Sequence, residues 1–152
     1  MAKELVLPSR IQRSRARGWR MPPSAIYVGR PARWSNSWII GSNMYDPAVP
    51  GGWRKVETIE DAIAAFRRCV DWDPDGIWWD STDDEGNRVT AWGGFGPIHR
   101  NRKTAKAELA GHDLACWCGL CDAHRALGKP LGVDCPDCKP CHADVLLALA
   151  NA

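Results

Sequence analysis

The chain has 152 residues, a formal net charge of +2 and 45% hydrophobic residues, which fits a single domain large enough to bury a core. No stretch approaches the length of a membrane span, and the apolar run at the N-terminus is too short for a signal peptide. We therefore expect a cytoplasmic protein with no membrane partner.

The net charge is small because two segments of the chain carry opposite charges. Residues 3–33 carry eight basic residues and one acid, whereas residues 71–85 carry seven acids and no base. A basic segment favours a nucleotide or nucleic acid as partner. Neutralisation of the basic arm by the acidic segment within the fold is the alternative.

The predicted elements alternate between strands and helices along the chain. We expect, in order, a basic irregular arm over 1–24, strands at 25–28 and 38–40, a loop over 41–52, a helix over 59–70, a hairpin of 76–79 with 88–92, a helix over 104–110, a strand at 114–118 and a helix over 143–151. This order predicts a small α/β or α+β layered domain over residues 25–152.

Cysteine is concentrated near the C-terminus, where residues 116–144 hold six of the seven cysteines and two of the four histidines. In a reducing compartment such close pairs favour metal over disulfide. Two sets of four ligands have the spacing of a closed structural zinc site. One set is Cys121, His124, Cys135 and Cys138; in the other, Cys118 replaces His124.

Four other residues of this segment suggest site chemistry. Cys141 and His142 open the last predicted helix, where a thiol has a lowered pKa and can act as a nucleophile. With Cys116 and an orienting Asp144 they form a predicted catalytic set. An extension of the metal site, or simple capping and packing, are the alternatives.

Several motifs resemble one known family. They are RIQR at 10–13, GWRMP at 18–22, YVGRP at 27–31 followed by Arg33 and Trp34, LACWC at 114–118 and PCHADVLL at 140–147. They are similar to domain of unknown function 4326, an uncharacterised family common in actinobacteria and their phages. The family usually has Trp-Gly-Asn-Pro-Phe where this chain has Trp-Ser-Asn-Ser-Trp at 34–38.

The resemblance also implies how the cysteines divide. Shorter members join Cys-Trp-Cys to Cys-His-x-Asp by only a few residues, which makes Cys116, Cys118, Cys141 and His142 the shared core. Residues of about 119–140 are then a zinc-stapled insertion. An insertion should carry its own ligands, so the resemblance favours the set that contains His124.

Two functions follow as hypotheses. In the first, the protein binds or acts on a nucleotide or nucleic-acid base: Arg30 and Arg33 hold phosphate, Trp34 and Asn36 contact the base, and the cysteines and His142 form the pocket floor. In the second, it is a non-catalytic module that binds nucleic acid or a host protein. The sequence contains no Walker loop, dinucleotide fingerprint or hydrolase triad, and leaves open whether the protein is an enzyme.

Overall fold

The protein is represented by a computed structural model that describes residues 7–46, 48–71, 78–82, 85, 88–92 and 100–152. Its elements are β1 (Ser9–Gln12), β2 (Ile26–Tyr27), β3 (Asn43–Tyr45), β4 (Trp53–Lys55), α1 (Ile59–Val70), β5 (Trp78–Thr82), β6 (Arg88–Trp92), α2 (Arg102–Leu109), β7 (Leu114–Cys116), α3 (Asp122–Arg125), β8 (Lys129–Pro130) and α4 (His142–Ala150). The mixture of helices and strands confirms the predicted α/β class.

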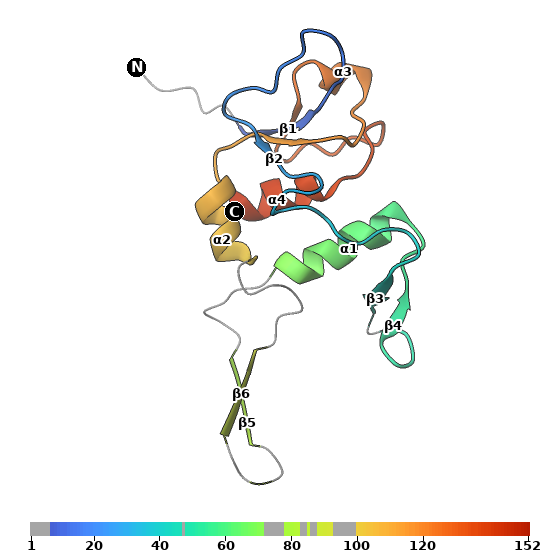
Figure 1. The fold of residues 1–152 in the computed structure, drawn as a ribbon, viewed down its shortest axis with the longest axis vertical. Coiled ribbons are helices and arrows are strands. Elements are labelled where there is room, and N and C mark those ends of the chain that lie inside the picture. Colours follow the sequence, from blue (N-terminus) through green and yellow to red (C-terminus); the bar gives the residue numbers. More distant parts are fainter. Residues whose placement is uncertain (1–6, 47, 72–77, 83–84, 86–87, 93–99) are drawn as a thin grey trace.

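A four-stranded sheet in the order β2-β7-β1-β8 forms one layer (Figure 1). β7 lies between β1 and β2 and is parallel to both, with Ile11 and Tyr27 each in register with Ala115. β8 runs antiparallel to β1. Helix α4 packs against β1 and β7, and α1 and α2 pack against α4 from the other side. α4 is therefore the central layer.

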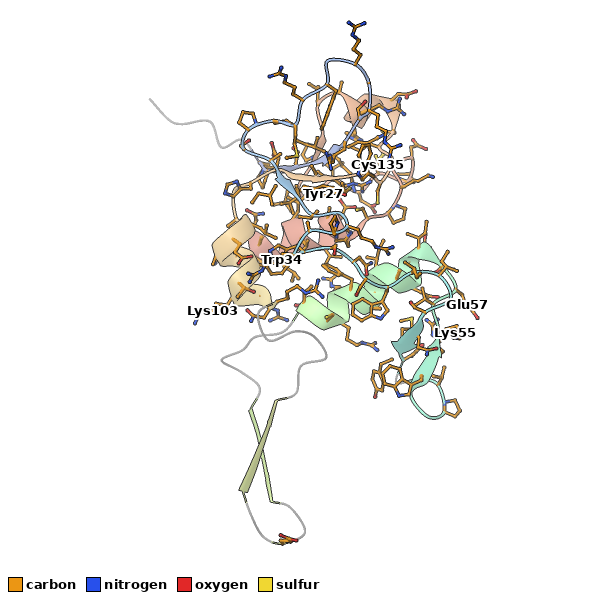
Figure 2. The ribbon with its side chains drawn as sticks, in the orientation of Figure 1. Tyr27, Trp34, Lys55, Glu57, Lys103 and Cys135 are labelled. Carbon is orange, nitrogen blue, oxygen red and sulfur yellow. The ribbon has the colours of Figure 1, made fainter. Side chains whose placement is uncertain are left out.

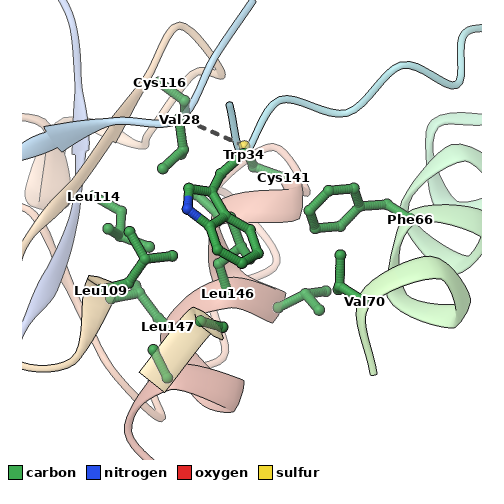
Figure 3. Close-up of a cluster of buried hydrophobic side chains, with 14 residues drawn as sticks. Val28, Trp34, Phe66, Val70, Leu109, Leu114, Cys116, Cys141, Leu146 and Leu147 are labelled. Atoms are coloured by element: carbon green, nitrogen blue, oxygen red, sulfur yellow. Dashed lines mark hydrogen bonds between the residues drawn. The ribbon is translucent and has the colours of Figure 1, made fainter. Parts of the chain in front are cut away.

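The main hydrophobic core surrounds this central helix. Figure 3 shows Trp34 between Phe66 of α1, Leu109 of α2 and Leu146 of α4. The Trp34 side chain is 3% exposed, and its indole N–H donates to Glu108 Oε2 over 2.6 Å. A buried indole needs such a partner for its N–H. Helix α2 therefore both packs against Trp34 and supplies the hydrogen-bond acceptor for its indole N–H.

Helix α1 begins with a capping box. Thr58 Oγ1 accepts from the Asp61 backbone N–H at 3.1 Å, and the Asp61 carboxylate accepts from the Thr58 backbone N–H at 3.3 Å. Arg54 of β4 also donates to both oxygens of Asp61. Hydrogen bonds from Arg54 hold the pKa of this carboxyl well below its usual range. One aspartate thus caps α1 and fastens the β3–β4 hairpin to it.

Arg10 joins β1 to the cysteine-rich part of the chain. Its side chain is fully buried. One Nη donates to Asp144 Oδ2 at 2.7 Å, and the other donates to the carbonyl oxygen of Lys139 at 2.7 Å and to those of Cys118 and Gly119 at 3.4 Å. A single guanidinium therefore holds two loops and the first turn of α4 in place.

Several predicted elements are confirmed. The 59–70 helix has the predicted bounds and cap. The strand at 25–28, the strand at 114–118 and the helices at 104–110 and 143–151 are present with shifts of one or two residues at their ends. The expected hairpin is present as β5 and β6, but β5 is Trp78–Thr82 where the prediction was 76–79. Residues 76–77 and parts of the turn lie outside the described residues.

Two predictions were wrong. Residues 38–40 form no strand; instead β3 and β4 pair across the segment that was expected to be a loop. The arm is not irregular throughout, because Ser9–Gln12 pairs with β7 and β8 inside the sheet. Its partners lie more than a hundred residues away, so local sequence carries no sign of the pairing. Among the described residues, no helix is long and apolar enough to cross a membrane.

Replacing Arg10 should be costly. Arg10→Met leaves three loop carbonyls and one carboxylate without this buried donor, and we expect a loss of about 3 kcal/mol in unfolding free energy. Arg102→Met is the control, since its ion pair with Asp71 is half exposed and should contribute less than about 1 kcal/mol. Urea unfolding followed by circular dichroism measures both. Equal losses would contradict the role given to Arg10.

Removing the helix cap should have a smaller effect. Thr58→Ala deletes the hydroxyl acceptor of the capping box, with an expected loss of about 1 kcal/mol in unfolding free energy. Ser37→Ala, at an exposed position outside any helix, should change it by less than about 0.5 kcal/mol. The same urea titration separates the two, and an unchanged Thr58→Ala midpoint would argue against the cap.

Candidate functional site

Four predicted ligands come together as one group, which we call the knuckle cluster: Cys121, His124, Cys135 and Cys138. Three sulfurs and one imidazole nitrogen lie within 4.8 Å of one another. His124 Nδ1 is 3.2 Å from Cys121 Sγ and 3.4 Å from Cys138 Sγ. Four Cys and His donors at such separations fit the tetrahedral shell of a metal ion. The cluster can therefore hold a metal.

Local structure places these four side chains. Cys121 precedes the single turn α3, which brings His124 back beside it. A turn in which the Cys138 N–H donates to the Cys135 carbonyl supplies the second pair, and the Cys121 N–H points at Cys138 Sγ over 3.3 Å. Backbone N–H groups directed at sulfur are a common feature of thiolate sites.

The segment that carries the knuckle cluster is fastened to β1. Leu120 donates its N–H to Gln12 Oε1 at 2.8 Å, and Leu131 donates to the Pro8 carbonyl at 2.9 Å. Gly128 has φ +83°, and a Cβ there would lie 3.0 Å from Ser9 Cβ. Only glycine combines this backbone angle with so close an approach.

A second group of three thiols lies at the end of β7, and we call it the strand-end cluster: Cys116, Cys118 and Cys141. Their sulfurs lie within 4.8 Å of one another, and the Cys141 thiol donates to Cys116 Sγ at 3.2 Å (Figure 3). All three cysteines are free thiols. Cys116 ends β7, while Cys141 is the residue before α4.

His142 lies beside this cluster with a defined tautomer. Its Nε2 is 2.7 Å from the Val28 carbonyl oxygen, which can only accept, so the proton is on Nε2. Nδ1 is then an acceptor, 3.6 Å from Cys141 Sγ. Burial lowers the pKa of His142, which keeps the imidazole neutral. Phe66 packs edge-on against the ring.

The three thiols ionise unequally. Hydrogen bonds with Cys116 and Cys141 lower the pKa of Cys118 well below its usual range, and the nearby Arg10 guanidinium acts in the same direction. The hydrogen bond with Cys118 raises the pKa of Cys116 to about 11. Hydrogen bonds with Cys116 and Cys118 also raise the pKa of Cys141.

A cavity of about 710 Å³ opens above the strand-end cluster. Cys116, Cys118, Cys141 and His142 are among its lining residues, and we call this part the cavity floor. Its polar, aromatic and aliphatic walls include Arg30, Asn36, Lys139, Tyr27, Trp38, Trp117, Ile39, Ile40, Ile59 and Ile63. This volume and mixture of side chains are typical of a small-molecule site.

The structure brings together part of the predicted site. Cys116, Cys141 and His142 lie on the cavity floor, and Arg30 and Asn36 lie in its walls. Arg30 Nε donates to the Asn36 carbonyl at 3.0 Å. The Asn36 amide donates to the Ala62 carbonyl and accepts from the Trp38 N–H, both at 3.0 Å. Asn36 therefore fixes the loop that carries the cavity wall.

Three predicted residues lie elsewhere. Asp144 pairs with Arg10 and with Lys129, while His142 donates its hydrogen bond to the Val28 carbonyl. Trp34 is in the core, and Arg33 pairs with Glu108 at 3.0 Å. Figure 2 shows Tyr27 toward the sheet and Trp34 toward α1 and α2. The arrangement gives no support to a substrate contact by Arg33 or Trp34, or to an orienting role of Asp144.

Other residues of the site were missed by the sequence reasoning. Cys118 belonged to the shared core that the resemblance implies, but it was not in the predicted catalytic set. Tyr27 and Lys139 were in neither set, since their place in the cavity depends on contacts between distant segments.

Comparison with known proteins agrees with the motifs. The sequence model of a family described as Domain of unknown function (DUF4326) matches residues 11–152, which include both clusters and every described residue of the cavity wall. No curated protein and no solved structure matches the chain. The resemblance seen in the motifs is confirmed: the chain belongs to the DUF4326 family.

Proposed function

We propose that the protein binds and acts on a nucleotide or nucleobase in the cavity above the strand-end cluster. The observation that carries this proposal is the composition of that one cavity. Its floor presents three thiols and a neutral imidazole, and its walls present both aromatic rings and cationic side chains. Reactive groups, a base-sized apolar space and cations near its edge are the parts that such chemistry needs.

The aromatic wall residues suit a heterocyclic base. Tyr27, Trp38 and Trp117 supply π-faces, on which bases stack whatever their identity. Isoleucines from α1 and from residues 39–40 complete the apolar surface. A base held here lies directly over the cysteines and His142.

The cationic wall residues suit phosphate. Arg30 and Lys139 are both exposed and both line the cavity, and arginine pairs with phosphate through two parallel hydrogen bonds. The bond from Arg30 Nε to the Asn36 carbonyl orients the guanidinium before a ligand arrives. A phosphate at this edge places the base toward the floor.

The knuckle cluster supports this site from outside the cavity. Three cysteines and one histidine are a donor set that zinc prefers, and four protein ligands leave no open position. α3 contains no buried residue, so the metal replaces the apolar core that this short segment lacks. We therefore assign the knuckle cluster a structural zinc that stabilises residues 119–140.

The basic arm favours a second function, binding of single-stranded nucleic acid. Arg13 and Arg15 lie over the ring of Trp117 at 4.9 and 5.1 Å, and Trp117 is 44% exposed. Arg17 and Arg20 are exposed beside them. Cations alternating with an aromatic ring at the surface can follow a strand whose bases stack. In that case the cavity takes one nucleotide of the strand.

The cavity proposal predicts a difference between two neighbouring arginines. Arg30→Met removes a phosphate contact and should weaken binding of a nucleoside monophosphate about tenfold or more. Arg33→Met, outside the cavity and paired with Glu108, should leave the affinity within about twofold. Quenching of tryptophan fluorescence across the four common nucleoside monophosphates and their free bases measures both. Equal effects, or no ligand that binds, would overturn the proposal.

The second function predicts a salt effect. Arg15→Gln with Arg17→Gln should make oligonucleotide binding less dependent on salt, with a decrease of about 1.4 in the logarithmic slope if both contact phosphate. Arg102→Gln, on α2, is the control. Fluorescence anisotropy of a labelled single strand over a range of salt concentrations gives the slope. An unchanged slope would argue against phosphate contacts by Arg15 and Arg17.

The structural zinc predicts a loss of metal with two substitutions. Cys135→Ser with Cys138→Ser should hold one zinc fewer per chain than the wild type and should unfold at lower temperature. Cys69→Ala, which changes a cysteine outside both clusters, should keep the full metal content. Native mass spectrometry of protein purified without chelator counts the ions. An unchanged count in the double variant would exclude this assignment.

A further inference from the structure

We infer that the strand-end cluster is a second metal site, in which the thiolates of Cys116, Cys118 and Cys141 hold a zinc ion with one coordination position open to the cavity. This inference does not depend on which molecule the cavity binds. It concerns the three thiols themselves, which the proposed function leaves without a defined role.

The spacing of the sulfurs fits a metal. In a tetrahedral site with Zn–S bonds of about 2.3 Å, sulfurs lie roughly 3.8 Å apart. The three sulfurs here are within 4.8 Å of one another, with Cys116 and Cys141 at 3.2 Å. Small movements of the thiol groups reach the required separation. Among the described residues, only this group and the knuckle cluster bring three or more such ligand atoms so close together.

The charged residues around the cluster also fit a bound zinc ion. Three thiolates and one Zn²⁺ leave a net charge of −1, which is costly to bury without a counter-charge. Arg10 and Lys129 together carry two positive charges against the one negative charge of Asp144. One unit of positive charge is therefore left over, and the Arg10 guanidinium is fully buried and donates to the carbonyl of Cys118.

Arg10 also makes the site rigid. Its Nη2 donates to carbonyls on both ligand-bearing loops, at Cys118 and Gly119 on one side and at Lys139 on the other. The sulfurs are thus held in place from outside the ligand shell. Fixing ligands through such outer contacts is characteristic of metal sites.

His142 completes the surroundings. Its Nε2–H donates to the Val28 carbonyl, which orients the ring and leaves Nδ1 without a proton. Nδ1 is 3.6 Å from Cys141 Sγ, yet His142 is outside the group whose ligand atoms all lie within 4.8 Å. We therefore assign Nδ1 as a hydrogen-bond acceptor next to the open position and not as a fourth ligand.

The two clusters border different cavities and differ in their number of ligands. All three cysteines of the strand-end cluster line the cavity, whereas its described walls include no member of the knuckle cluster. Three protein ligands with an open fourth position are the arrangement of catalytic zinc, and four are that of structural zinc. The open position would take water or an oxygen or nitrogen donor of a ligand, such as a base.

Cobalt substitution tests the inference on the intact chain. We expect the wild type to bind two Co²⁺ per chain, with thiolate-to-cobalt absorption from both. Azide should alter the spectrum of one cobalt only, because only the strand-end site has an open position. A single equivalent, or two equivalents that do not respond to azide, would overturn the inference.

Two variants assign the azide response. Cys118→Ser should lower the affinity for one cobalt at least tenfold and abolish the azide response, whereas Cys135→Ser with Cys138→Ser should retain that response. If Cys118→Ser does not fold, the response in the knuckle variant alone decides the matter. Because metal and azide are the only probes, the result is distinguishable from a failure of the nucleotide proposal.

Discussion

The fold depends most on the buried contact between Arg10 and its partners. A guanidinium cannot lose its charge, so once buried it needs acceptors. Both Nη atoms of Arg10 have them, whereas its buried Nε has no hydrogen-bond partner among the described residues. Here the acceptors are a carboxylate on α4 and carbonyls of two loops. Arg10 therefore fixes β1, the two cysteine loops and the start of α4 relative to one another, and these are the segments that carry the cysteines of the cavity.

The same donor chemistry is used twice in a short stretch of chain, with different surroundings. The knuckle cluster lies on a segment that has little core of its own, and a metal bound there would substitute for packing. The strand-end cluster is embedded in the core beside Phe66 and Val28, where packing already defines its shape. A metal in the first position contributes mainly to folding, and a metal in the second is free to contribute to chemistry.

Local sequence information was enough for some features and not for others. The helix Ile59–Val70 and the four knuckle ligands were predictable because cap, periodicity and ligand spacing all lie within about twenty residues. The role of Arg10 was not, since its carboxylate partner is 134 positions away. Trp34 shows the same limit. Its neighbours Arg30 and Arg33 suggested a binding site, yet the indole packs beneath α2, which follows some seventy residues later.

The position of β8 has a consequence for the state of the protein in solution. β8 covers the free side of β1 in the sheet, and the knuckle segment holds β8 there. A strand with an uncovered side offers its backbone groups to any other chain. A metal held in the knuckle would then help to keep β8 on β1 and so prevent self-association. A chain without it would be prone to pair edge to edge with its own copies.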